Sequence, residues 1–398
     1  ATRFILYHYL HSGGVFFYHM DQRRQRPSII SAPLDWQPGQ WHHLAATWRD
    51  GRLRLYIDGQ KVPQELQVEL GPLGEFLNVG APGKGVADTH LDELYVFSRA
   101  LEAVEIQALF RRRDHNTEAA LVVPRMSAPT LDGVISPGEW SSAAAVTGFV
   151  NRVTGLADAE QGVAWLGWDD EYLYLAQRWP VPEKVRREPD LYSFGPVRKT
   201  ATSPDDPALL EDDCVGIAAS LEGSTRRILA NALGTVWDDL GGVPSWSSGT
   251  RARSSLDAHW WSCEMAVPRS ALSAAAEDKL RLQLVRTHRL LRSDDVSWPG
   301  AGREDFAAVT LAADAPAVQL TGLGQPWTGL VDLRLSSTAP ARAAISTDSG
   351  EVQLEHQLSP TSPLELRRVL ADTSATALRL QVSSGDQLLL AMALPFTY

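Results

Sequence analysis

Tryptophan is the residue type whose placement in this chain bears most directly on ligand chemistry. The chain has 13 tryptophans, and most of them lie in its middle part. An indole face stacks on the apolar C–H face of a sugar ring, while the sugar hydroxyls need polar partners. Trp260 and Trp261 are adjacent in a strand-like run, so one of them faces outward or toward a cleft. Trp246, in "GGVPSWSSG", and Trp179, beside Pro180, have no obvious place in a core. For each, core packing and ligand stacking both remain open.

Acidic side chains occur as adjacent groups, a pattern that suits calcium binding better than catalysis. Glu211, Asp212 and Asp213 form the densest group, and Asp169 and Asp170 form another. Calcium takes several oxygen ligands from carboxylates and loop carbonyls. Two interpretations stay open, a Ca²⁺ site that includes Glu211, Asp212 and Asp213, or a solvated acidic loop.

No pattern of catalytic residues is present in the sequence. It contains no G-x-S-x-G, no phosphate-binding loop and no H-E-x-x-H. Asp92 and Glu93 are adjacent in "HLDELY", so in a strand they point to opposite faces and cannot act as a pair of catalytic carboxylates. We therefore predict a protein that is not an enzyme.

The two cysteines, Cys214 and Cys263, allow two interpretations. Both lie in strand-like sequence, where a buried thiol is common. A single disulfide between them is the alternative, and it would imply export from the cell. Spacing alone does not decide between these.

Length and charge restrict the class of protein. A chain of 398 residues is too long for one core, which predicts two or three domains. The formal net charge of −11 argues against a nucleic-acid partner, which would require a basic surface. No apolar run is long enough to span a membrane. The first residues read as the start of a strand, so we expect a mature or excised piece.

A frame of β-strands is predicted to position these residues. Within 1–113 short alternating runs are separated by turn residues, as in an all-β sandwich. The clearest is a hairpin over 41–60 with an Asp50-Gly51 turn, which we expect to close a sandwich rather than form a site. A helix follows Leu101, with a hydrophobic staple to Ile106 and Glu105 in the position of a capping box.

Residues 1–113 resemble the laminin-G-like, concanavalin A-type jelly-roll family. The resemblance rests on "WQPGQWHHLAATWRDGRLRLYIDGQKV", "LNVGAP" and "LDELYVFSRALEAVEIQALF", in that order. It implies a jelly roll that lacks its first strands here. It also implies a calcium ion at the rim, with Asp92 as a ligand. The helix lacks the Ser or Thr cap of the family, so its start should be weaker.

Residues 114–314 resemble the family 9 carbohydrate-binding modules. The segments "APTLDGVISPGEW", "DDEYLYLA", "EDD", "EMAVPRSAL" and "SWPG" occur in the order typical of that family. The resemblance implies a sugar end held between two indoles. The candidate ligand-binding residues are Trp246, Trp179, Trp298, Arg286 and Asn231, the last two as contacts to sugar hydroxyls.

Residues 315–398 contain no motif, and their alternating runs predict about seven strands of an immunoglobulin-like sandwich. The predicted fold class is therefore all-β, with three β-sandwich domains (1–113, 114–314 and 315–398) and one short helix after the first.

The expected function is noncatalytic carbohydrate binding by a secreted or cell-surface bacterial protein. Its expected partner is a polysaccharide or glycan, with Ca²⁺ as the one cofactor considered. Two alternatives remain open. One is a structural or adhesive subunit that self-assembles through exposed sheet edges. The other is an accessory part of a larger glycoside hydrolase or lyase.

Overall fold

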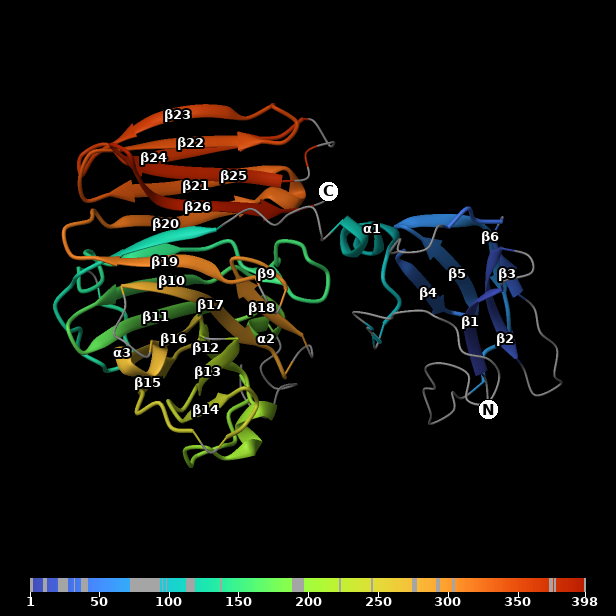
Figure 1. Ribbon diagram of the computed structural model, residues 1–398, viewed down its shortest axis with the longest axis horizontal. Coiled ribbons are helices and arrows are strands. Elements are labelled where there is room, and N and C mark those ends of the chain that lie inside the picture. The colour runs from blue at the N-terminus through green and yellow to red at the C-terminus, as the bar shows by residue number, and fades with distance from the viewer. Residues whose placement is uncertain are drawn as a thin grey trace. The chain divides into compact units, whose positions relative to one another are not determined.

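The computed structural model divides into two compact units, residues 1–113 and 114–398 (Figure 1). Each unit is considered by itself. The structure describes residues 3–9, 13–20, 28–31, 33–36, 42–71, 94, 96–97, 99–111, 119–136, 138–187, 197–221, 223–244, 246–273, 278–290, 294–302, 305–371, 375 and 377–396.

The first unit contains two three-stranded antiparallel sheets in its described part. One sheet has β1 (Arg3–Tyr9), β2 (Gly14–Met20) and β3 (Ser28–Ile30), and the other has β4 (Leu44–Arg49), β5 (Arg52–Ile57) and β6 (Gln60–Gln67).

The predicted hairpin of the first unit is confirmed as β4 and β5. Asp50 and Gly51 both have positive φ, 50° and 76°, as a two-residue turn of the favoured hand requires. Trp48 lies opposite Leu53, and Leu53 and Leu55 are fully buried. The hairpin therefore contributes one face to a sandwich core, which is the structural role expected for it.

The predicted helix is α1 (Ala103–Arg111). The Glu105 carboxylate accepts a hydrogen bond from the backbone N–H of Glu102 at 2.8 Å, as in a capping box. Leu101 and Ile106 are buried in one small cluster, so the staple is also confirmed.

The second unit is a double layer of two long sheets. The first sheet has the order β15 (Arg251–Leu256), β16 (Trp260–Pro268), β11 (Tyr172–Pro180), β10 (Val163–Trp168), β8 (Ala144–Val146), β20 (Val318–Gln325), β21 (Leu330–Ser337), β24 (Leu364–Val369). We call it the eight-stranded sheet.

The second sheet of this unit is longer. Its order is β14 (Val236–Leu240), β13 (Ser224–Asn231), β12 (Cys214–Leu221), β17 (Lys279–Thr287), β19 (Ala307–Ala312), β7 (Ala120–Pro124), β26 (Gln387–Pro395), β25 (Ala377–Ser384), β22 (Ala341–Thr347), β23 (Gln353–Leu358), with β18 (Asp295–Trp298) beside β17 and β9 (Val150–Asn151) beside β18. Short helical turns complete the unit: α2 (Glu183–Arg187), η3 (Pro207–Glu211), α3 (Arg269–Leu272) and η4 (Pro326–Thr328).

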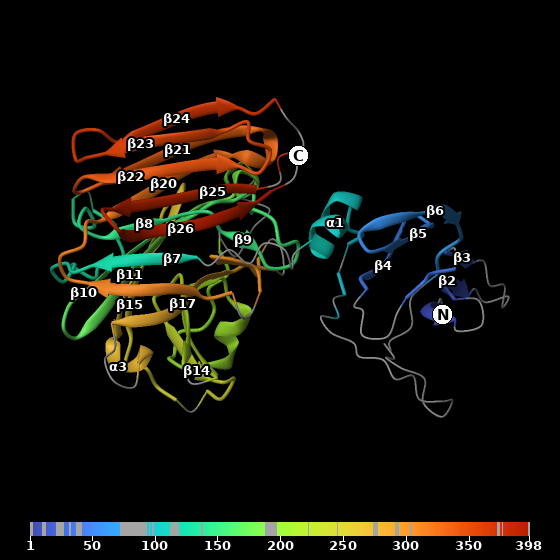
Figure 2. The ribbon, with the colours of Figure 1, turned by 45° about the horizontal axis from the view of Figure 1, so that its top comes forward.

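Both sheets continue across the predicted domain boundary between residues 314 and 315. Strand β7 pairs with β19 on one side and with β26 on the other, and β8 pairs with β20. Figure 2 shows the strands of 318–395 extending the same two layers. Residues 315–398 are therefore a continuation of the second unit rather than a separate body.

The described architecture is all-β, as predicted. One large cluster of buried apolar side chains extends from Ala119 to Phe396 between the two sheets. Cys214 and Cys263 are both buried free thiols, on β12 and β16. Within the described residues, no helix is long and apolar enough to span a membrane.

Candidate functional site

The adjacent tryptophans of β16 face opposite sides of the eight-stranded sheet. Trp261 is 1% exposed and belongs to the core between the sheets, whereas Trp260 is 45% exposed. This follows from the alternation of side chains along a strand. The prediction that one of the two faces outward or toward a cleft is confirmed, and it identifies an exposed indole on the outer face of this sheet.

Two side chains from neighbouring strands accompany Trp260 on that outer face. Strand β11 lies between β16 and β10, and the carbon at the centre of the Arg178 guanidinium is 5.1 Å from the Trp260 ring centroid and 5.4 Å from that of Trp165. On β11, Arg178 lies two residues from Pro180, which pairs with Trp260 of β16, and two residues from Ala176, which pairs with Trp165 of β10. Each indole is therefore a diagonal neighbour of Arg178, one on each side of β11. We call Trp165, Arg178 and Trp260 the Trp–Arg platform.

The guanidinium of Arg178 keeps its hydrogen-bonding capacity. With the residues that the structure describes it makes ring contacts but no hydrogen bond or ion pair. Asp257, in the turn before Trp260, instead accepts hydrogen bonds from the backbone N–H groups of His259 (2.7 Å) and Trp260 (2.8 Å), which lower the pKa of Asp257. An arginine presents five N–H donors, so this one can bind oxygen atoms of a ligand.

A loop at Asp132-Gly133 lies on the outer face next to the platform and is fixed by Glu264. The buried Glu264 carboxylate accepts hydrogen bonds from Asp132 N–H (3.1 Å), Gly133 N–H (2.9 Å) and the indole N–H of Trp140 (2.9 Å). The Ser262 hydroxyl, directly opposite Arg178 in the register, donates to the Gly133 carbonyl at 2.6 Å. Burial raises the pKa of Glu264, against the opposing effect of its donors.

Glycine is required at position 133 of this loop. Gly133 has φ of +88°, and a Cβ there would come within 2.5 Å of the Ser254 carbonyl carbon. The close approach of loop and strand gives the "LDG" stretch a structural explanation.

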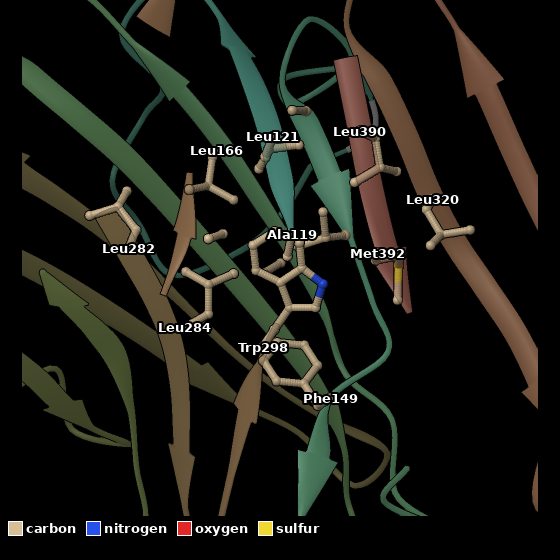
Figure 3. Packing of buried hydrophobic residues seen from close by; sticks show 14 of the residues in the cluster. Ala119, Leu121, Phe149, Leu166, Leu282, Leu284, Trp298, Leu320, Leu390 and Met392 are labelled. Atoms are coloured by element: carbon tan, nitrogen blue, oxygen red, sulfur yellow. The ribbon is translucent and has the colours of Figure 1, made fainter. Parts of the chain in front are cut away.

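Two of the predicted sugar-stacking residues, Trp179 and Trp298, are each 1% exposed. The Trp179 ring packs 4.6 Å from Phe149, and its N–H donates to the Gln177 side chain at 3.0 Å. Trp298 lies among Leu121, Leu284 and Met392 in the core (Figure 3). Neither indole presents a face to solvent, so their assignment as sugar platforms is corrected to core packing. The error arose because strand ends are not exposed where a second sheet covers them.

Asn231 and Arg286 are also part of the interior. The Asn231 amide donates to the Ala201 carbonyl and to Asp212, and its oxygen accepts from the N–H groups of Leu233 and Thr235. This uses all four of its hydrogen-bonding positions. Arg286 is 4% exposed, with its guanidinium 4.2 Å from the Trp261 ring centroid. The expectation that they contact sugar hydroxyls is corrected to a structural role.

Trp246 is half-buried against the main core. The Arg226 guanidinium lies 5.5 Å from its ring centroid and donates to the Ala271 carbonyl at 2.7 Å. One face of this indole is therefore occupied by a fixed side chain. Trp246 remains a candidate for stacking on a sugar, but less of its ring is exposed to solvent than its position in a loop suggested.

The acidic group of the calcium prediction is used mainly within the chain. The buried Asp212 carboxylate accepts hydrogen bonds from Thr200 N–H, Thr200 O–H, Ala201 N–H and the Asn231 amide. Asp213 accepts from the N–H groups of Arg198 and Arg289, while Glu211 is exposed.

These contacts leave Asp212 no free lone pair for a metal. Asp92 lies outside the described residues. Within the described part, no group of three or more His, Cys, Asp or Glu side chains is arranged to hold a metal ion. Calcium binding stays a prediction.

Sequence reasoning missed Arg178 as a site residue. The available signal was its position between Gln177 and Trp179 in "YLYLAQRWP", where the alternation places it on the opposite face from both. The informative pattern has two parts. A charged residue occupies an outward-facing position of an otherwise apolar strand, and a neighbouring strand carries two adjacent tryptophans.

Comparison with known proteins finds one family model that matches most of the first unit. Residues 2–107 match the family model of the concanavalin A-like lectin/glucanases superfamily. The predicted resemblance of this unit is thereby confirmed. No curated protein sequence matches the chain.

Solved structures match about half of the chain. A proposed carbohydrate-binding protein from Bacteroides uniformis is 15% identical, covers 48% of this chain and 97% of its own, and has a TM-score of 0.36. A family 9 carbohydrate-binding module from Caldicellulosiruptor kristjanssonii, in complex with cellotriose, is 12% identical. The match covers 49% of this chain and 95% of that module, with a TM-score of 0.34.

Proposed function

We propose that the protein is a noncatalytic carbohydrate-binding protein whose ligand ring stacks on the exposed face of Trp260. The observation that carries the proposal is a tryptophan that is 45% exposed on a sheet face, beside an arginine with unused donors. The indole provides the apolar surface for the C–H face of a pyranose, and the guanidinium provides donors for its oxygens.

The rigidity of the platform supports the proposal. Trp165 and Arg178 arise from the interior strands β10 and β11, and Trp165 is 7% exposed and packed into a buried cluster. Arg178 is therefore held between two rings before any ligand arrives. A prearranged site loses little conformational entropy on binding. We place this function outside the cell or at its surface, where polysaccharides are encountered.

A glycan array with three proteins tests the proposal. Wild-type protein, Trp260→Ala and Trp246→Ala are applied with and without Ca²⁺, and any positive glycan is titrated by calorimetry. We expect Trp260→Ala to weaken binding at least fivefold and Trp246→Ala to bind within about twofold of wild type, since a lost stacking contact costs on the order of 1 kcal/mol or more.

Trp246→Ala is a matched control because, of the three tryptophans predicted from the sequence to stack on a sugar, Trp246 is the one that the structure leaves partly exposed. Circular dichroism establishes that all samples are folded. Loss of binding in Trp246→Ala with retention in Trp260→Ala would move the site to the β14–β15 connection. Release of reducing ends from a bound glycan would contradict the noncatalytic part of the proposal.

A further inference from the structure

The charge environment of Arg178 indicates which sugars fit the platform. Several arginines of this unit are paired with carboxylates among the described residues, as in Arg227–Asp239 at 2.9 Å and Arg289–Asp295 at 2.8 Å, whereas Arg251 is not. Arg178 has no such partner in the described structure, although the chain carries a net charge of −11. We infer that the ligand itself supplies the carboxylate, and that the platform binds a uronic acid residue of an acidic polysaccharide. This inference rests on the proposed function.

Three described carboxylates near the platform already accept hydrogen bonds from this chain, and the first of them, Asp132, accepts from the Val134 N–H at 2.7 Å. Asp257 accepts two backbone N–H groups in its turn. Glu264, two residues along β16 from the partner of Arg178, is buried and accepts three donors. None of the three forms an ion pair with the guanidinium in the described structure. A ligand carboxylate can therefore approach its edge without displacing an existing ion pair.

The geometry matches a single sugar residue that carries an acid group. The guanidinium centre lies over the Trp260 ring, 5.1 Å from its centroid, so a sugar stacks on the other face of the indole and an acid group at the edge of that sugar lies within reach of Arg178. The guanidinium centre lies within 5.4 Å of both ring centroids and makes no hydrogen bond with the described residues, so its N–H donors are available to a ligand. A carboxylate accepts two parallel N–H bonds from the edge of a guanidinium, which a single neutral hydroxyl does not.

The inference is tested with paired ligands that differ in charge. Galacturonate, glucuronate and mannuronate oligosaccharides are each titrated as the free acid and as the neutral methyl ester. The proteins are wild type, Arg178→Gln, Trp260→Ala and Arg251→Gln. Arg251 is the matched control because it lies on the same sheet, stacks on Tyr172 at 5.0 Å and has no ion pair in the described structure.

We expect wild type and Arg251→Gln to bind at least one free acid tenfold or more tightly than its ester, with an affinity that falls as NaCl is added. Arg178→Gln should bring acid and ester to within about twofold of each other, and Trp260→Ala should weaken both. Equal binding of acid and ester, still lost in Trp260→Ala, would overturn the uronate inference and leave the proposed function intact. Binding to no saccharide by folded protein would overturn both.

Discussion

At the scale of single residues, burial decides which polar groups are available to a ligand. Asn231, Asp212 and Glu264 are fully buried, and each is engaged in three or more hydrogen bonds within its own chain. Arg178 differs because its described contacts are with aromatic rings. Most of the candidate site residues chosen from the sequence therefore stabilise the fold. Arg178, which was not among them, is the best-placed hydrogen-bond donor for a ligand.

Glu264 provides a prediction on stability. Glu264→Ala leaves the Gly133 N–H and the Trp140 indole N–H without an acceptor, while the Asp132 N–H keeps the Thr130 carbonyl, so we expect the free energy of unfolding to fall by about 3 kcal/mol in urea denaturation. Glu264→Gln keeps one acceptor oxygen and should cost less. A loss below about 1 kcal/mol for Glu264→Ala would contradict the proposed attachment of the loop.

The raised pKa of Glu264 predicts a pH dependence with a definite sign. A carboxyl whose pKa is raised by folding favours the protonated folded state, so its contribution is fully present below the unfolded pKa and is lost as pH rises through the folded pKa. The free energy of unfolding of wild type, relative to that of Glu264→Gln, should therefore fall as pH rises from about 4 to 7. A shift in the opposite direction would mean that the hydrogen bonds outweigh burial.

The buried thiols predict chemical inertness in the native state. Burial raises the pKa of Cys214 and that of Cys263, the latter to about 12. We expect neither to react with a thiol reagent at pH 8 until denaturant is added, when both should react. Rapid labelling of folded protein, or an intact mass lower by two hydrogens, would contradict the free, buried state.

At the scale of elements, the alternation of side chains along each strand predicted which residues are buried better than the position of a residue within a motif did. It placed Trp260 and Trp261 on opposite faces and gave the β4–β5 hairpin its core face. It failed for Trp179 and Trp298 because alternation does not reveal which face a second sheet covers. Nor could it show that Asp132-Gly133 folds onto β16, since that contact joins residues more than 120 positions apart.

The loop contact leads to a prediction with a control in the same segment. Gly133→Ala forces a Cβ to within 2.5 Å of Ser254 at positive φ, so we expect a loss on the order of 2–3 kcal/mol. Gly138 also has positive φ, +85°, but nothing lies within 4 Å of its Cβ position. Gly138→Ala should cost about 1 kcal/mol from backbone strain alone. Equal losses in urea denaturation would contradict the close approach at Gly133.

At the scale of the whole molecule, continuous sheets predict how many parts unfold independently. Residues 114–398 share one apolar core and two sheets, whereas 1–113 form a separate unit. We expect calorimetry to resolve two unfolding transitions. Trp298→Ala should lower the free energy of unfolding of the larger unit by about 3–5 kcal/mol and leave the transition of the smaller unit unchanged. Three transitions would instead support an independent domain over 315–398.

The ends of the two long sheets bear on the assembly alternative. Among the described strands, β14, β15, β23 and β24 end their sheets. Self-assembly through these edges stays a prediction, which sedimentation of the purified chain tests.

The central claim is that a sugar binds at Trp260, and indole N–H signals in NMR test it most directly. The signals of Trp260 and Trp165 are assigned from Trp260→Phe and Trp165→Phe, and the glycan identified on the array is then titrated into wild-type protein. We predict that these two signals shift first and furthest among the 13 tryptophans. Shifts confined to Trp246, with Trp260 unmoved at saturation, would contradict the account.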